Sequence, residues 1–150
     1  MADDMSILEL IKQDHERTQK ALESIKNTST RTTGTRDRPW KAMKSDLNAH
    51  MIGEENVFYP ALEAVMKDEI LVAVEEHNLI KTMLQQMNDL PKDEDFWTAK
   101  LKVLMENVRQ HIQDEEARIF KAATGEFSKE QLLDMGRRFE EAKELVLREE

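Results

Sequence analysis

The sequence contains no cysteine, only four glycines and three prolines, and few aromatic residues. Without cysteine, the chain has no disulfide, no thiolate metal site and no cysteine nucleophile. Scarce glycine and proline, together with abundant Glu, Lys, Leu, Ala and Met, favour long helices over strands. A length of 150 residues suits one domain. We therefore expect a single all-α domain over residues 1–150.

Membranes and nucleic acids are poor partners for this chain. No apolar run approaches the roughly 20 residues of a membrane span. The N-terminal Met-Ala-Asp-Asp lacks the basic and apolar regions of a signal peptide. The 31 acidic and 22 basic residues give a formal net charge of −9, which repels phosphate backbones. We expect a soluble, cytoplasmic protein that contacts neither a membrane nor a nucleic acid.

Start and stop signals divide the chain into five helices. Ser6-Ile7-Leu8-Glu9 and Ser128-Lys129-Glu130-Gln131 fit capping boxes, which mark the first and last helix starts. The polar, Thr-rich stretch 28–36 is predicted as a loop. The predicted helices run from Ser6 to about Asn27, from Pro39 through a kink at Pro60 to about Met66, from Asp68 to about Leu90, from Asp93 or Asp95 to just before Gly125, and over about 128–148.

Four long helices joined by short links predict an up-down-up-down four-helix bundle over about residues 6–124. The additional C-terminal helix has an apolar face made of Leu132, Met135, Phe139 and Val146. We expect this face to pack on the bundle; the alternative is a surface for a protein partner, which the sequence does not name. One basic cluster is expected to be solvated surface and not an anion site: Arg31, Arg36, Arg38, Lys41 and Lys44.

Residues spaced alternately by three and four mark the buried seam of each bundle helix. The predicted seams are Leu8, Ile11, His15, Thr18, Leu22 and Ile25; Trp40, Met43, Leu47, His50, Glu54, Val57, Ala61 and Ala64; Ile70, Ala73, His77, Ile80, Leu84 and Met87; and Trp97, Leu101, Leu104, Val108, His111, Glu115, Arg118 and Ala122.

All four His residues of the chain fall on a seam, one in each helix, and two carboxylates, Glu54 and Glu115, do so as well. An unpaired buried carboxylate is costly, so these positions need a cation. A lone seam His is more often a hydrogen-bonded core residue, but four of four on seams favours a metal site.

The two halves of the predicted bundle share a motif. His50-Met51-Ile52-Gly53-Glu54-Glu55 matches His111-Ile112-Gln113-Asp114-Glu115-Glu116, and an aromatic residue follows each His nine positions later, at Tyr59 and Phe120. In so acidic a chain, one such motif arises by chance about 4% of the time, and two about 0.2%. The repeat predicts a pseudo-twofold axis through the bundle. The second Glu of each pair, Glu55 and Glu116, is expected to face solvent or to support a ligand.

The HxxxE spacing places an imidazole and a carboxylate one turn apart on the same helix face. One metal would leave most of the six groups unused, whereas two metals fit if each takes two His and both Glu residues bridge. Two carboxylates and a bridging oxide or hydroxide would offset the charge of the metals. Mixed imidazole and carboxylate ligands suit iron, with zinc or manganese as alternatives.

The order His, HxxxE, His, HxxxE on four successive helices resembles the hemerythrin-like (HHE) cation-binding family over about residues 6–124, and the Phe58-Tyr59-Pro60 segment is similar as well. The resemblance implies that His15 and His50 bind one iron, that His77 and His111 bind the other, and that Glu54 and Glu115 bridge an oxo- or hydroxo-bridged pair. Oxygen-carrying hemerythrins have a further His where this chain has Lys81. They also bridge with an Asp five residues after the last His, where this chain has Glu116.

The expected function is therefore that of a non-haem di-iron protein that binds or reacts with oxygen, nitric oxide or peroxide. Such a centre would also support a peroxide-decomposing or oxidase-type side activity. Four-His members of the family are associated with sensing oxygen or iron, with nitric oxide chemistry and with peroxide breakdown. Two alternatives stay open from the sequence: an iron- or oxygen-responsive regulatory module, and a structural bundle filled with zinc.

Overall fold

The computed structural model describes residues 4–28 and 34–149. Its elements, in chain order, are α1 (Ile7–Lys26), α2 (Asp37–Gly53), the π-helix η1 (Glu54–Phe58), α3 (Tyr59–Leu62), α4 (Lys67–Asn88), α5 (Asp95–Asp114), the π-helix η2 (Glu115–Ile119), α6 (Phe120–Glu126) and α7 (Lys129–Arg148). The segments α2, η1 and α3 follow one another without a break, as do α5, η2 and α6. The chain thus forms four long bundle helices and a fifth, C-terminal one.

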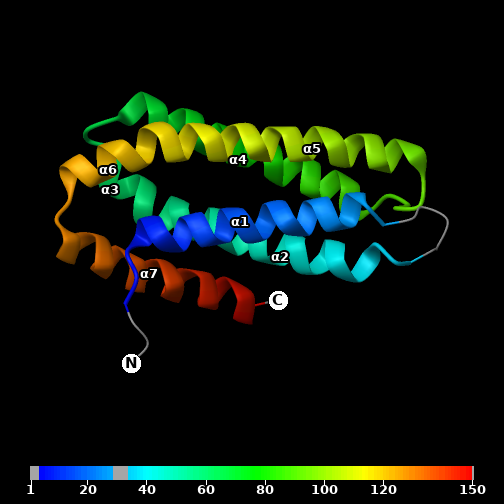
Figure 1. Ribbon diagram of the computed structural model, residues 1–150, viewed down its shortest axis with the longest axis horizontal. Coiled ribbons are helices and arrows are strands. Elements are labelled where there is room, and N and C mark those ends of the chain that lie inside the picture. Colours follow the sequence, from blue (N-terminus) through cyan, green and yellow to red (C-terminus); the bar gives the residue numbers. More distant parts are fainter. Residues whose placement is uncertain (1–3, 29–33, 150) are drawn as a thin grey trace.

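The four long helices run antiparallel to their sequence neighbours (Figure 1). In the bundle α1 contacts α2 and α5, while α4 contacts α5 and, on its other side, α2 and α3. The predicted up-down-up-down bundle is confirmed. The C-terminal helix α7 packs against α1, α2 and η1 on the outside of the first helix pair. Its apolar face is buried there through Met135 and Phe139.

Both predicted capping boxes are present. The Ser6 hydroxyl accepts from the backbone N–H of Glu9, and the Ser128 hydroxyl accepts from that of Gln131. Other boundaries differ slightly: α2 begins at Asp37 and α4 at Lys67. The fourth long helix also continues through Gly125 to Glu126, because a single exposed glycine weakens a helix without ending it.

Each long helix that carries HxxxE changes its winding at the Glu. Glu54 and Glu115 are the first residues of η1 and η2, where the hydrogen bonds run from residue i to i+5. The amide of Tyr59 donates to the Glu54 carbonyl, and that of Phe120 donates to the Glu115 carbonyl. Because η2 contains no proline, Pro60 is not the common cause of this winding.

The π-helices shift the buried stripe by one residue, so the predicted seams fail at four positions beyond the HxxxE motifs, although the predicted seam residue Val57 is buried. Leu62 is buried in the position expected of Ala61, and Ile119 replaces Arg118. An α-helical period carried past the π turn selects the wrong face. The predicted seam residues that are not buried after the turns are Ala61, Ala64, Arg118 and Ala122.

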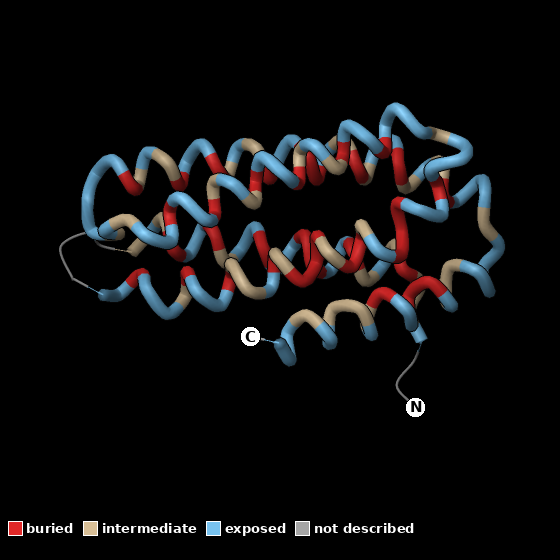
Figure 2. Tube along the Cα trace, turned by 180° about the vertical axis from the view of Figure 1, so that it is seen from behind, coloured by how far each residue is buried: buried red, intermediate tan, exposed pale blue. Residues whose placement is uncertain are grey.

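The buried residues line the inner faces of the helices (Figure 2) and form two separate apolar clusters. One cluster contains Trp40 and Trp97, packed edge to face with ring centroids 5.1 Å apart. The other contains Ile7, Phe58 and Phe139. The His and Glu residues of the predicted site lie outside both clusters and separate them along the bundle. In the described part of the chain, no helix has the length and apolar character needed to cross a membrane.

Arg36 corrects the expectation for the basic cluster, since it is only 3% exposed. Its guanidinium donates to the Thr28 and Thr98 hydroxyls at 2.8 Å and to the Lys92 carbonyl at 3.1 Å. It therefore joins the end of α1 to the start of α5 as a structural residue. Arg31 lies outside the described residues, and Arg38 and Lys41 are exposed as expected.

Candidate metal centre

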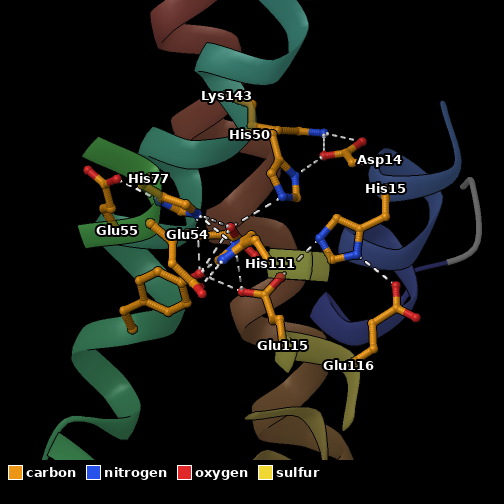
Figure 3. A network of polar contacts seen from close by, with 12 residues as sticks. Asp14, His15, His50, Glu54, Glu55, His77, His111, Glu115, Glu116 and Lys143 are labelled. Carbon is orange, nitrogen blue, oxygen red and sulfur yellow. Dashed lines mark hydrogen bonds and ion pairs between the residues drawn. The ribbon is translucent and has the colours of Figure 1, made fainter. Parts of the chain in front are cut away.

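The bundle brings all six predicted ligand residues together (Figure 3). The four His residues come from α1, α2, α4 and α5, and the two Glu residues begin η1 and η2. Each residue is at most 5% exposed: His15, His50, Glu54, His77, His111 and Glu115. Side chains that ionise are rarely buried this deeply unless they are paired or bind a metal.

Their donor atoms form two overlapping groups. In the first, atoms of His15, His50, Glu54 and Glu115 all lie within 4.8 Å of one another; in the second, Glu54 joins His77 and His111. His15 Nε2 is 3.0 Å from Glu115 Oε1, and His50 Nε2 is 3.2 Å from Glu54 Oε1. His77 Nε2 lies 3.0 Å from the same Glu54 oxygen. Glu54 therefore touches both His pairs.

Each of the four imidazoles is held from outside by a carboxylate. His15 Nδ1 donates to Glu116 at 2.7 Å and His50 Nδ1 to Asp14 at 2.8 Å. His77 and His111 donate in the same way to Glu55 and Glu76, both at 2.7 Å. Because an ionised carboxylate only accepts hydrogen bonds, Nδ1 carries a proton and Nε2 is the nitrogen available to a metal. This pattern of carboxylate, His and central Nε2 is typical of metal-binding His residues.

The outer carboxylates follow the internal repeat. Asp14 precedes His15 and binds the His of α2, while Glu76 precedes His77 and binds the His of α5. Sequence reasoning missed Asp14 and Glu76. The signal was an acidic residue directly before each of these two His residues.

Glu55 and Glu116 were expected to face solvent or to support a ligand, and both contact a His from the other half of the chain. Thus each Glu-Glu pair places one carboxylate in the centre and uses the next to orient an imidazole.

Two lysines extend this network. Lys143 Nζ of α7 lies 2.8 Å from Asp14 Oδ2, and Lys81 Nζ lies 2.9 Å from both oxygens of Glu55. Lys81 occupies the position where oxygen carriers place a further His, and its ammonium pairs with a carboxylate. It acts on the centre through Glu55 and His77.

Burial and charge compete in setting the ionisation of the metal-free centre. Burial lowers the pKa of His15, but hydrogen bonds to Glu115 and Glu116 outweigh it and raise that pKa to about 9. Burial also lowers the pKa of His50. The negative charge of Glu54 and the hydrogen bond to Asp14 outweigh burial and raise that pKa to about 10. Burial raises the pKa of Glu54, but the positive charge of His50 outweighs it and holds this pKa well below its usual range. Protons on imidazoles thus balance the buried carboxylates when no metal is bound.

In the described residues, four buried side-chain atoms have no partner in hydrogen-bond geometry: His15 Nε2, His50 Nε2, Glu54 Oε2 and Glu115 Oε1. Both Nε2 atoms lie beside a carboxylate oxygen, at 3.0 Å for His15 and Glu115 and at 3.2 Å for His50 and Glu54. All four belong to the predicted ligands and all are atoms that a metal could use. An unsatisfied buried polar group costs about 1–3 kcal/mol, so four such atoms in one place favour a site that binds a cation. The donor set therefore fits metal ions with nitrogen and oxygen ligands.

Comparison with known proteins gives the family. The sequence model described as Hemerythrin HHE cation binding domain matches residues 6–123. This chain belongs to the hemerythrin HHE family. An uncharacterized hemerythrin-like protein of Schizosaccharomyces pombe is 30% identical to this hemerythrin-like chain over 145 residues, which cover 93% of the chain and 70% of the relative. No solved structure matches the sequence significantly.

The two sides of this hemerythrin-like centre have different surroundings. On one side α7 covers His50, whose ring meets the edge of Phe139 with centroids 5.8 Å apart. On the other side, a cavity of about 270 Å³ between α4 and the α5–η2 helix is lined by His111 and Glu115. Val72, which is 58% exposed, also lines this cavity, so the cavity reaches the surface. This cavity therefore connects His111 and Glu115 with solvent.

Proposed function

We propose that this hemerythrin-like protein holds two iron ions and that the centre binds or reacts with oxygen, nitric oxide or peroxide. The observation that carries the proposal is the convergence of four Nε2 atoms and two carboxylates in two groups that share Glu54. His15 and His50 would hold one ion and His77 and His111 the other, with Glu54 and Glu115 between them. A pair of iron ions would supply redox electrons and Lewis acidity to a bound small molecule.

The chain supports such a centre in three ways. The outer carboxylates fix each imidazole with Nε2 inward, which sets the ligand geometry before a metal arrives. The two apolar clusters exclude bulk water at both ends of the polar layer. The cavity beside His111 admits a small molecule, while the acidic surface of the chain disfavours large anionic ones.

A tiny internal cavity of about 10 Å³ also touches the centre. It is lined by all four His residues and otherwise by apolar or weakly polar side chains: Thr18, Leu47, Met51, Ile80, Val108 and Ile112. This volume corresponds to about one water molecule. A site of this size and character supports a substrate of two or three atoms over an organic molecule.

Metal content and optical spectra of the iron-reconstituted protein test the proposal. We expect about two irons per chain and absorption in the near ultraviolet and visible from an oxo-bridged ferric pair. His15→Ala and His77→Ala should each lower the iron content, because each removes a ligand from one group. Glu75→Ala is the matched control, since Glu75 is exposed on α4 and neighbours Glu76 without facing the centre. Protein that takes up one iron or none, or only zinc, would refute the di-iron proposal.

A regulatory role is the second candidate, and one contact favours it. Lys143 links α7 to Asp14, and Asp14 holds His50. A metal bound by His50 would draw a proton from that ring and alter the charge that Asp14 and Lys143 balance. Comparing the effect of iron on the protease sensitivity of α7 and of α5 distinguishes the roles, because general stabilisation by the metal would protect both helices, whereas a regulatory role would change α7 selectively.

A further inference from the structure

Tyr59 is the chain's single tyrosine, and its hydroxyl lies among the predicted ligand atoms. The side chain is 2% exposed. Its hydroxyl donates to Glu115 Oε2 at 2.5 Å and lies 3.3 Å from Glu54 Oε1. The same oxygen is 3.3 Å from His77 Nε2 and 3.4 Å from His111 Nε2. It therefore faces one of the two His pairs.

These distances match the spacing of ligands around one ion. Ligand atoms about 2.0–2.1 Å from a metal and at tetrahedral or octahedral angles lie about 2.8–3.4 Å from each other. Five of the six pairs among the oxygens of Tyr59 and Glu54 and the Nε2 atoms of His77 and His111 meet this condition, at 3.0, 3.1, 3.3, 3.3 and 3.4 Å. In the sixth pair, donor atoms of Glu54 and His111 lie within 4.8 Å of each other. Without Tyr59 this group has three donors from Glu54, His77 and His111. The phenol oxygen adds a donor to these three, besides the Glu115 carboxylate that is proposed to lie between the two ions.

The other half of the repeat has no such oxygen. Phe120 stands where the first half has Tyr59, nine residues after the His of its helix. It is only partly buried, and its ring stacks on His15 with centroids 6.4 Å apart. The two halves therefore match in their His and Glu residues and differ in this one hydroxyl.

We propose that Tyr59 is an additional ligand, binding as phenolate to the ion held by His77 and His111, so that the two metals of the centre are chemically different. The inference rests on the proposed metal centre. When the ion binds, the phenol O–H bond breaks and a bond from oxygen to the metal forms. The released proton leaves through Glu115, its hydrogen-bond acceptor, to solvent. No electron is transferred in this step, so a redox-silent ion can test it.

Zinc titration of the metal-free protein, followed by ultraviolet difference absorbance, is the test. Phenolate absorbs at longer wavelength than phenol, and with one tyrosine in the chain any phenolate signal belongs to Tyr59. We expect about one phenolate per chain to appear as zinc fills the His77–His111 group. Iron(III) should add a visible charge-transfer band, and Tyr59→Phe should abolish both signals. That variant copies the residue of the other half and should bind one of its two zinc ions at least about tenfold more weakly.

The double variant Tyr59→Phe/Phe96→Tyr is the matched control. It keeps one tyrosine, moved to a position near the start of α5 that is 45% exposed and belongs to neither group of ligands, so zinc should produce no phenolate signal. A signal from this variant would show that the absorbance reports the environment and not ligation, and would overturn the inference. Two zinc ions bound by the parent chain without any phenolate would overturn Tyr59 as a ligand and leave the two-metal centre intact. Fewer than two zinc ions would overturn both proposals.

Discussion

Lys143 and Asp14 form a buried ion pair that joins the C-terminal helix to the metal centre, with 2.8 Å between Nζ and Oδ2. Asp14 also accepts from His50, so this one carboxylate connects α7 to a predicted ligand. Both side chains are largely hidden from water, at 15% and 8% exposure. The pair is therefore screened much less than an ion pair on the surface.

We expect Lys143→Met to destabilise the protein by about 1–3 kcal/mol, because it leaves Asp14 buried without its ammonium partner while keeping the bulk of the side chain. Urea denaturation followed by circular dichroism measures this loss. Arg148→Met is the control, since Arg148 pairs with Glu144 on the exposed end of α7 and such pairs contribute little. Equal losses for the two variants would contradict the role given to Lys143.

A second prediction concerns the close contact between α7 and the backbone at the start of α1. A Cβ at Gly136 would lie 2.3 Å from the Met5 carbonyl oxygen and 3.2 Å from the Ile7 nitrogen, so Gly136→Ala must displace backbone. We expect a loss of about 1–3 kcal/mol in unfolding free energy, as for other overpacked sites. Gly125→Ala is the matched control, because nothing lies within 4 Å of its Cβ in α6. It should be neutral or add up to about 1 kcal/mol through helix propensity.

The two residues of the second Glu-Glu pair should behave differently. Glu115→Ala removes a carboxylate that contacts His15, His111 and Tyr59, so it should empty or scramble the metal centre. Glu116→Ala removes the support of His15 alone and should keep the stoichiometry while weakening binding about 10- to 100-fold. Metal content and competition with a chelator separate the two effects. A larger defect in Glu116→Ala would mean that this helix bridges through the residue five after the His.

The metal-free protein should lose stability as the pH rises above about 6.5. The pKa values of His15 and His50 rise on folding, from 6.5 to about 9 and about 10, so their stabilisation is complete below pH 6.5 and is lost toward pH 9–10. The pKa of Glu54 falls well below 4.5, so its contribution is present above pH 4.5 and is lost in acid. Metal-free protein should therefore be most stable between about pH 4.5 and 6.5.

Bound metal should prevent the loss of stability at alkaline pH, because the ligands are deprotonated in the complex. The gain in melting temperature on adding zinc should be small near pH 6 and large near pH 8.5. Parallel thermal scans of metal-free and zinc-loaded protein over this range measure the difference. A gain that is constant with pH would show that metal does not replace protons on these imidazoles.

The features that the sequence predicted correctly are those that depend on local contacts or on a regular helical spacing. Ser6 and Ser128 marked helix starts correctly because a capping box is a local contact within one turn. The convergence of the six His and Glu side chains followed from a stripe with constant spacing. From Ala61 and Arg118 onward the same stripe failed, because the π turns that begin at Glu54 and Glu115 add one residue to the helical period.

Other features depend on contacts between distant segments. The acidic residue before His15 repeats before His77, but this local signal does not show that Asp14 binds a His 36 residues away and a Lys 129 residues away. Arg36 looked like one member of a solvated basic cluster, and only the packed fold shows the carbonyls and hydroxyls around its guanidinium. The repeat identified Tyr59 as a counterpart of Phe120, but the inward direction of its hydroxyl depends on η1.

The internal twofold relation has a consequence for how such a protein can change over time. Two identical helical hairpins around one axis would supply the same four imidazoles and two carboxylates, but every substitution would then appear twice. In a single chain that carries both hairpins, each copy can vary alone. One copy here has a phenol and a covering fifth helix, while the other has a phenyl ring and a cavity. Covalent joining of the two halves is thus what permits a symmetric set of ligands to have two unlike sides.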